Sequence, residues 1–282
     1  MTNNKIFKAV LFLFLVTNVA FAWGPVGHKT IANIAEDNLH PKAKQKILAI
    51  LGTTDMASVA SWPDTIRSER SETSPWHYVD LDVRINQTVD DIAKHCENDN
   101  CVVGQINKEI KELKAAEKEG GSNNDVKVEE NLKFLIHFIG DLHQPMHCSN
   151  DDDKGGNQKI VRLFNKDGGG EGTKMNLHAV WDRLIEPTTI EDPVEFSSEL
   201  KKEITRDEKK KWSSGTVESW ALESYGIAKD KIYPEFTTPG PTPKDTEVTL
   251  SKDYYKNMRP IENEQMKKAG IRLAEVLNEI FL

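Results

Sequence analysis

Three features are scarce in this sequence: cysteine, positive charge and long apolar runs. Three cysteines allow one disulfide within the chain at most, with one thiol left over. The formal net charge of −8 argues against a protein that clamps duplex DNA through many phosphate contacts. It does not exclude an enzyme that meets phosphate groups through bound metal cations. After residues 1–22 no segment is apolar enough to cross a bilayer, so we expect no stable membrane association.

The one apolar run opens the chain, where residues 1–22 have the pattern of a secretory signal peptide. Two lysines and a short apolar segment precede Ala20-Phe21-Ala22, whose small residues are typical of a cleavage site. The alternative, a membrane anchor, requires a longer apolar run. We therefore expect a mature chain that begins at Trp23 and is secreted or periplasmic. Residues 23–282 are expected to form one domain, because no linker or repeat divides them.

The cysteine spacing predicts a small closed loop. Cys96 and Cys101 flank the turn-prone residues 97–100, and in an oxidising compartment we expect them to form a disulfide. Cys148 is then left over, directly after a histidine. It could be a buried thiol, a neighbour of a metal or an unpaired reactive group, and a small buried residue is the favoured interpretation.

Hydrophobic spacing predicts a mainly α-helical protein. Residues 53–90 are expected to be irregular with short extended pieces, and residues 233–250, with four prolines, to form an irregular crossover. A short strand is expected from Ile160 to Phe164. A first helix is expected to follow the opening residues of the mature chain and to end at about Asn38. The later predicted helices cover Pro41 to Leu51, Val103 to Lys118, Val126 to Leu142, Asn176 to Glu186, 194–209, 214–229 and 251–281.

The most informative segment is His137-Phe138-Ile139-Gly140-Asp141-Leu142-His143-Gln144-Pro145-Met146-His147. His137 and Asp141 are four residues apart, so a helix places both on one face. Pro145 is expected to end or kink that helix and to redirect His147 toward the same space. Imidazole nitrogens together with a carboxylate suit zinc.

A second pair with this spacing, His178 and Asp182, follows further along the chain. One such pair is weak evidence, because chance often produces it. Two pairs, together with the isolated His28 and His77, make a metal site the better explanation. A free α-amine at Trp23 could add a ligand, since its neutral form is accessible near neutral pH and can chelate a metal with its own carbonyl.

The order of these motifs resembles the S1/P1 nuclease family, secreted zinc-dependent nucleases of single strands that also act as 3′-nucleotidases. The resemblance covers nearly the whole mature chain and implies a single-domain, multi-helix fold of the phospholipase C/P1 nuclease type with a three-zinc cleft. The bacterial zinc phospholipases C share this fold, so a zinc-dependent phospholipase C is the alternative function. The resemblance is based on Trp23 with His28, Trp62-Pro63-Asp64 with Arg67, Trp76-His77-Tyr78-Val79-Asp80, the segment 137–147, Gly155-Gly156-Asn157, and Asn176-Leu177-His178 with Trp181-Asp182.

By this resemblance, three Zn2+ ions would be bound in one cleft. Asp141 would bridge two of them, because a carboxylate can offer one oxygen to each ion and a histidine cannot. His143 lies in the motif but would be structural rather than a ligand. The ligands expected are Asp64, His77, His137 and Asp141 for the first ion, the Trp23 amine and carbonyl, His28 and Asp141 for the second, and His147, His178 and Asp182 for the third.

The resemblance also implies a mechanism for cleaving single-stranded DNA and RNA to 5′-phosphate products. A hydroxide shared by two zinc ions would attack the phosphate, and the third ion would stabilise the leaving 3′-oxygen. Arg67 and Asn157 would lie beside the scissile phosphate, and together with Asp64 they form the expected catalytic set. For Arg67 the alternative is a surface ion pair.

Tyr78 and Asp80 would form a base pocket by the same resemblance, with the ring stacking on the base and the carboxylate accepting a hydrogen bond. Stacking needs an unpaired base and tolerates any base, so it explains a preference for single strands without sequence specificity. For Tyr78 the alternative is a core aromatic residue. The expected substrates are single-stranded DNA, RNA and 3′-nucleotides, and the protein is expected to be a monomer.

Overall fold

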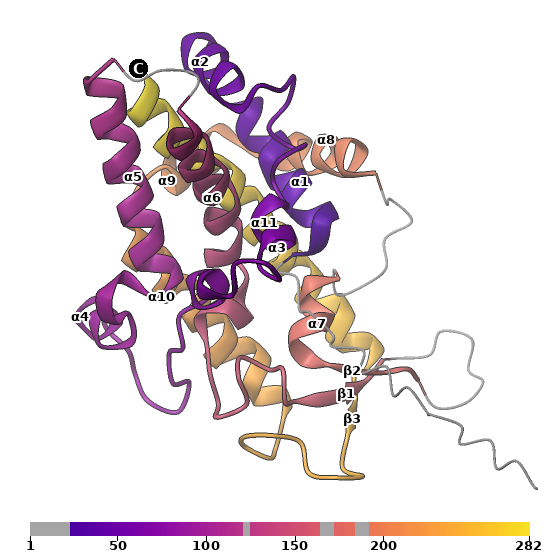
Figure 1. Ribbon diagram of the computed structural model, residues 1–282. Coiled ribbons are helices and arrows are strands. Elements are labelled where there is room, and N and C mark those ends of the chain that lie inside the picture. The colour runs from indigo at the N-terminus through magenta and orange to yellow at the C-terminus, as the bar shows by residue number, and fades with distance from the viewer. Residues whose placement is uncertain (1–22, 121–124, 164–171, 184–191) are drawn as a thin grey trace, which may run out of the picture.

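The computed structural model describes residues 23–120, 125–163, 172–183 and 192–282. These residues form a mainly helical single domain, as the sequence predicts (Figure 1). Residues 1–22, the predicted signal peptide, lie outside the described residues. Within the described ranges, each helix is too short or too polar to span a bilayer.

Eleven α-helices and three short strands make up the described part of the chain, with one-turn helices between them. Two of the shorter turns, η1 (Ser71–His77) and η4 (Pro145–Cys148), bear on the site. The strands are β1 (Ile160–Arg162), β2 (Lys174–Asn176) and β3 (Val248–Thr249). The helices are α1 (Gly24–Glu36), α2 (Pro41–Leu51), α3 (Trp62–Ile66), α4 (Val89–Ile92), α5 (Val102–Lys118), α6 (Val126–Leu142), α7 (Leu177–Asp182), α8 (Pro193–Glu203), α9 (Arg206–Trp212), α10 (Val217–Ile227) and α11 (Lys252–Phe281).

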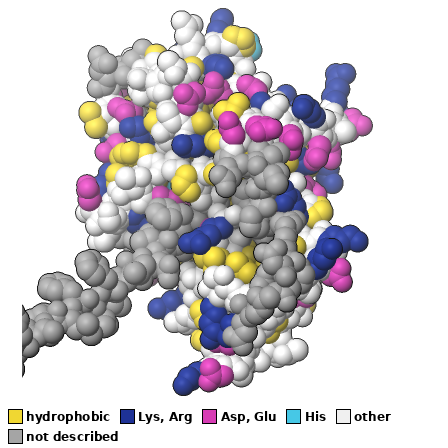
Figure 2. All heavy atoms as spheres, turned by 90° about the vertical axis from the view of Figure 1, so that its right-hand side faces the viewer, with side chains coloured by type: hydrophobic (Ala, Val, Ile, Leu, Met, Phe, Trp, Pro, Cys, Tyr) yellow, Lys and Arg dark blue, Asp and Glu magenta, His cyan; other side chains and the backbone are white. Residues whose placement is uncertain are grey.

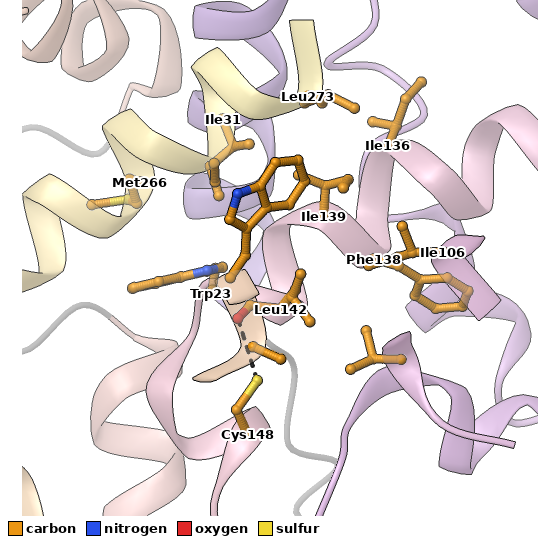
Figure 3. Close-up of a cluster of buried hydrophobic side chains, with 14 of the residues drawn as sticks. Trp23, Ile31, Ile106, Ile136, Phe138, Ile139, Leu142, Cys148, Met266 and Leu273 are labelled. Carbon is orange, nitrogen blue, oxygen red and sulfur yellow. Dashed lines mark hydrogen bonds between the residues drawn. The ribbon is translucent and has the colours of Figure 1, made fainter. Parts of the chain in front are cut away.

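The core is built around α11, which runs through the molecule and packs against α1, α5 and α6 (Figure 1). The buried residues of α1 include Ile31 and Ile34. Figure 3 shows Trp23 and Ile31 gathered with Ile139 of α6 and Leu273 of α11. Burying each such side chain stabilises the fold by about 1.5–3 kcal/mol. His137 and Asp141 of α6 therefore lie in surroundings from which water is largely excluded.

Four helices begin and end where the sequence predicts to within one residue, namely α2, α5, α6 and α11. The ends of α2 show why. Pro41 occupies the first turn, where its missing N–H is not needed, and the preceding His40 accepts a hydrogen bond from Lys42 N. Gly52 ends the helix with φ 60°, a backbone conformation that favours glycine.

The single helix predicted over 194–209 is wrong, because the structure has two helices there, α8 and α9. Thr205 begins the second helix: its side chain accepts a hydrogen bond from Glu208 N, and its own N–H donates to the Glu208 carboxylate. This capping box satisfies two N–H groups at the start of a helix. The free energy gained from these hydrogen bonds favours the start of a new helix over continuation of α8 through Ile204, which has an extended backbone.

Two other predicted helices differ from the structure in extent. The helix expected over 176–186 is α7, which ends at Asp182, and residues 184–191 lie outside the described residues. The helix expected over 214–229 begins only at Val217, because Thr216 caps it, and its end passes into a π-helical turn.

The segment 53–90 contains the short helices α3 and η1 and the start of α4. It also contains a short extended piece, as expected: Tyr78 has an extended backbone, and Asp82 forms a β-bridge with Asn150. The small sheet has the order β2-β1-β3, with β1 antiparallel to β2 and parallel to β3. The strand predicted from Ile160 is β1, and its predicted last residue, Phe164, lies outside the described residues. Because β2 leads directly into α7, the sheet fixes where α7 starts: Leu177 N donates to Lys159 O at 2.8 Å.

The predicted disulfide between Cys96 and Cys101 is present. Cys148 is buried, and its Sγ donates to the carbonyl of Leu142 at 3.3 Å (Figure 3). Burial raises the pKa of this thiol, so it stays protonated and is not a reactive group. On the face shown in Figure 2, acidic and basic side chains are interspersed rather than gathered into one basic patch.

Candidate metal centre

Asp141 lies at the centre of a group of buried histidines. Its Oδ2 is 2.9 Å from His77 Nδ1 and 3.3 Å from His137 Nε2, and its Oδ1 is 3.3 Å from His28 Nε2. His137 and Asp141 share the buried face of α6, as their spacing predicts. Asp64, on α3, lies 3.7 Å from His137 Nε2 through its Oδ2.

These residues form two groups that could each hold a metal ion, and the groups share His137. We call them the first cluster (Asp64, His77 and His137) and the second cluster (His28, His137 and Asp141). Asp141 Oδ2 also reaches His77 and His137 of the first cluster, so the carboxylate lies between the two groups. This is the placement that a bridging carboxylate requires.

A third cluster consists of His147, His178 and Asp182. His178 Nε2 lies 3.0 Å from His147 Nε2 and 3.6 Å from Asp182 Oδ2. His147 comes from η4, which begins at Pro145 after α6 has ended. Pro145 therefore stands at the turn that redirects the chain, as the sequence predicts.

Backbone carbonyls orient three of the imidazole rings. His137 Nδ1 donates to Ala60 O at 2.8 Å, His147 Nδ1 to His77 O at 2.6 Å, and His178 Nδ1 to Gly155 O at 2.6 Å. Because a carbonyl can only accept, each Nδ1 carries a proton, and in a neutral ring Nε2 then keeps a lone pair facing the cluster. His77 is turned the other way, with Nδ1 toward Asp141.

The residues present fit zinc ions. Ligands about 2.0–2.2 Å from a tetrahedral zinc lie roughly 3.3–3.6 Å from one another, which is close to the separations within the clusters. Buried carboxylate oxygens without a hydrogen bond occur among the described residues at Asp64 Oδ1 and Asp182 Oδ2. Leaving such oxygens unpaired is costly, and a bound cation would offset that cost.

The protonation states of the third cluster also suit metal binding. Burial lowers the pKa of His147 well below its usual range and that of His178 to about 4. Both rings are therefore neutral at pH 7, the form that binds metals. Burial raises the pKa of Asp182 well above its usual range, although Gln144 Nε2 donates to its Oδ1 at 2.7 Å. A divalent cation would favour the ionised carboxylate.

The first two clusters hold a coupled charge pair. Burial alone would disfavour both charges, but His137 and the other nearby histidines lower the pKa of Asp141 well below its usual range. Asp141 and Asp64 in turn raise the pKa of His137 to about 9 against the effect of burial. The centre is thus built around ionised Asp141.

Close packing brings the start of α1 onto α6. Trp23 is buried, and its Nε1 donates to Gly140 O at 2.7 Å, the carbonyl directly before Asp141. The absence of a side chain at Gly140 is required, because a Cβ there would lie 2.8 Å from His28 Nδ1. The His28 ring can therefore stack on His137 with 3.9 Å between centroids.

The residues predicted to contact the substrate lie around this centre. The Arg67 guanidinium is mostly buried and lies 3.7 Å from Asp64 Oδ1, so it faces the first cluster. Tyr78 is 40% exposed and is therefore no core aromatic residue, and Asp80 is exposed as well. The backbone of Tyr78 is held from the disulfide loop, since Val102 N donates to Tyr78 O at 3.0 Å.

Asn157 lies on the loop that also carries Gly155, and its side chain donates to Lys154 O at 2.9 Å. His143 belongs to none of the three clusters formed by the described residues. It donates from Nδ1 to Ile139 O and accepts from Arg272 at Nε2, 2.8 Å away. It is therefore a buried structural residue, as the sequence analysis proposed.

The sequence analysis missed the groups that orient the ligands. The role of Gln144, which donates a hydrogen bond to Asp182, could have been predicted, because Gln144 lies inside the segment 137–147. The carbonyls of Ala60 and Gly155 leave no signal in residue type, since every residue has a carbonyl group.

Comparisons with known proteins identify the family of the chain. A sequence model described as S1/P1 Nuclease matches residues 23–282. The chain belongs to the S1/P1 nuclease family. It is 34% identical over 297 aligned residues to Endonuclease 4 of Arabidopsis thaliana, covering 98% of this chain and 94% of that protein. Nuclease S1 of Aspergillus oryzae and Nuclease P1 of Penicillium citrinum are each 27% identical to this nuclease, over 94% and 92% of its length and 94% and 97% of their own.

Membership supports a nuclease function for this chain, and the relatives found are nucleases rather than phospholipases. For this S1/P1 nuclease, the three His/Asp clusters are the buried sites that could hold its metal ions.

Proposed function

We propose that the protein is a zinc-dependent phosphodiesterase that cleaves single-stranded DNA and RNA to 5′-phosphate products and also acts as a 3′-nucleotidase. The observation that carries the proposal is the position of Asp141 between two buried clusters, with Arg67 beside the first of them. A phosphodiester needs positive charge on its oxygens and an activated water, and this site is arranged to supply both.

Nine residues would hold three zinc ions. Zinc bound there would polarise the phosphate and lower the pKa of a water molecule toward neutrality. Asp141 would span the first two positions, and the Trp23 amine and carbonyl would complete the second. The other side chains are those of the three clusters: His28, Asp64, His77, His137, His147, His178 and Asp182.

Arg67 and Asn157 would bind the scissile phosphate. A guanidinium forms paired hydrogen bonds with phosphate oxygens, and its approach to Asp64 holds it against the first cluster. Asn157 would add a neutral donor by turning its amide from Lys154 O to the substrate. Together these groups would orient the phosphate and stabilise the charge that develops on it.

Tyr78 and Asp80 would receive the base. The exposed ring of Tyr78 can stack on an unpaired base, and the exposed Asp80 carboxylate can accept a base N–H. A paired base offers neither its face nor that edge, so single strands would be preferred over duplexes.

An extracytoplasmic location supports the same function. The disulfide is stable in oxidising surroundings, and the family match starts at Trp23, directly after the predicted cleavage site. Cleavage there would create the α-amine that the second zinc position uses.

A substrate panel tests the proposal. Purified protein that begins at Trp23 is incubated with single-stranded DNA, RNA, duplex DNA, a 3′-mononucleotide and phosphatidylcholine, each with and without a chelator. We expect chelator-sensitive cleavage of the single strands and dephosphorylation of the nucleotide. Cleavage of phosphatidylcholine alone would instead support the phospholipase C alternative.

A further inference from the structure

The loop of residues 150–158, which we call the glycine loop, carries two groups of the proposed site. Its Gly155 carbonyl accepts the hydrogen bond from His178 Nδ1 at 2.6 Å, so it fixes the ring of one third-cluster residue. Asn157, the proposed phosphate donor, follows two residues later. What holds this loop therefore also sets the geometry around the third cluster.

The backbone of the glycine loop is in a conformation that it would not adopt unaided. Asp152, Lys154, Gly155 and Gly156 all have positive φ, between 56° and 79°. For Asp152 and Lys154 this is unfavourable, because their Cβ atoms crowd the backbone. A Cβ at Gly155 would lie 2.6 Å from Met146 O, so the loop is also pressed against the turn that carries His147. Such a conformation persists only when its surroundings hold it.

Asp153 is the internal support of the glycine loop. It is fully buried, and its Oδ1 accepts hydrogen bonds from Gly156 N at 2.9 Å and Asp151 N at 3.3 Å. The carboxylate thus ties the start of the loop, at Asp151, to Gly156, the residue directly after Gly155. It can do this only while its own position is fixed.

Tyr233 fixes Asp153 from outside the loop. It lies directly after the π-helical turn that follows α10, and its buried hydroxyl is 2.9 Å from Asp153 Oδ1 and 3.2 Å from Oδ2. The phenol is the donor, because burial and Asp153 raise its pKa. A second tie, from Gly240 N to Asp151 Oδ2 at 2.7 Å, holds the start of the loop but not its glycines.

We propose that Tyr233 is a positioning residue for the third metal position, acting through Asp153 and the Gly155 carbonyl on His178. The inference rests on the proposed function in assuming that the third cluster binds zinc. Tyr233 acts on His178 indirectly, because its hydroxyl contacts Asp153, which is not one of the cluster residues. Its removal should weaken the third position selectively and leave the first and second clusters loaded.

The test uses Tyr233→Phe, which deletes one oxygen, with Tyr225→Phe as the matched control. Tyr225 is also a buried tyrosine, and its hydroxyl donates to the backbone carbonyls of Ile85 and Asp82, which lie outside the glycine loop. Zinc per protein is measured by elemental analysis after dialysis against a graded series of chelator concentrations, together with the thermal unfolding midpoint of each protein.

We expect Tyr233→Phe to lose one zinc of three at a chelator concentration about 10- to 100-fold lower than the wild type requires. Tyr225→Phe should retain all three zinc ions, even if its thermal unfolding midpoint falls by as much as that of Tyr233→Phe. Asp153→Asn, which keeps one carbonyl oxygen, is the second variant and should show the same selective loss.

Two negative results are distinguishable. If the wild type binds three zinc ions and both Tyr233→Phe and Asp153→Asn release them together with the wild type, the positioning role is wrong and the proposed function stands. If the wild type binds no zinc at all, the proposed function fails, and this inference fails with it.

Discussion

The Nδ1–H of His147 donates to the backbone carbonyl of His77, 2.6 Å away. His77 itself belongs to the first cluster, and its ring faces Asp141 of the second cluster, so one residue supports both the first and the third cluster. The three clusters are therefore connected rather than separate, and loss of a central carboxylate should affect all of them.

Asp141→Asn should abolish most of the nuclease activity. The amide is nearly isosteric but carries no charge and cannot offer an anionic oxygen to two ions. We expect a loss of more than about 100-fold, exceeding the 10- to 100-fold that loss of an outer hydrogen-bond partner typically costs, and a fall in zinc content. His143→Ala is the comparison: it removes one of the hydrogen-bond partners of the buried Arg272, which keeps Trp212 O and Glu223, and should lower stability by about 1–3 kcal/mol while zinc remains bound. Full activity in Asp141→Asn would refute the bridging role.

Arg67→Lys should lower kcat by about 100- to 1000-fold with zinc content unchanged, because a lysine cannot form the paired hydrogen bonds of a guanidinium. Arg70→Lys is the matched control, three residues on. Arg70 pairs with Glu72 and Glu130 near the surface, and such pairs contribute little. Equal rates for the two variants on single-stranded DNA would show that Arg67 does not act on the phosphate.

Tyr78→Ala should raise KM for single-stranded substrates roughly 5- to 150-fold, since stacking of one base contributes about 1–3 kcal/mol. Tyr78→Phe keeps the ring and should stay close to wild type. The measurement is steady-state kinetics on short oligonucleotides. A KM that is the same in the alanine and phenylalanine variants would assign base recognition elsewhere.

Glu109, buried on α5 and 3.8 Å from Lys108 Nζ, should make stability depend on pH. Burial raises its pKa from 4.5 to about 7, so the folded protein holds this proton more tightly than the unfolded chain. Its ionisation therefore costs stability as pH rises from about 4.5 to about 7, by on the order of 3–4 kcal/mol. Glu109→Gln should gain stability relative to wild type over this interval and little below it, as measured by urea unfolding at several pH values. A pH-independent difference would show that Glu109 is ionised throughout.

Protein with extra residues before Trp23 should bind less zinc and be less active than protein that begins at Trp23. An amide nitrogen has no lone pair to offer a metal, whereas a free amine does. Elemental analysis and single-strand cleavage compare the two forms. Equal zinc content and activity would exclude the Trp23 amine as a ligand.

The parts of the fold and site that could be predicted from sequence are those set by local spacing. His137 and Asp141 share a face because both lie on one helix, and α2 ends where proline and glycine place its ends. The break before α9 could also have been predicted from the sequence, because Thr205 and Glu208 form a recognisable capping box.

Contacts that depend on the backbone, or on residues far apart, had no such signal. Nothing in the residue type of Gly155 shows that its carbonyl meets His178. The pairing of Tyr233 with Asp153 spans 80 residues and becomes visible only after the chain has folded. The metal-binding role of the third cluster was predicted from the family resemblance. Local chemistry alone would not have shown that His147 is grouped with His178 and Asp182.

The disulfide loop has a practical consequence for handling the protein. Val102 N holds Tyr78 O, and Trp76 Nε1 donates to Asn100 Oδ1 inside the loop closed by Cys96 and Cys101. A phosphine reductant, which unlike a thiol is a poor zinc ligand, should therefore loosen the segment that carries Tyr78 and leave the buried clusters intact, whereas a chelator should remove metal from the clusters and leave that segment in place. Inactivation by the first reagent should reverse on reoxidation without added zinc, and inactivation by the second only when zinc is returned.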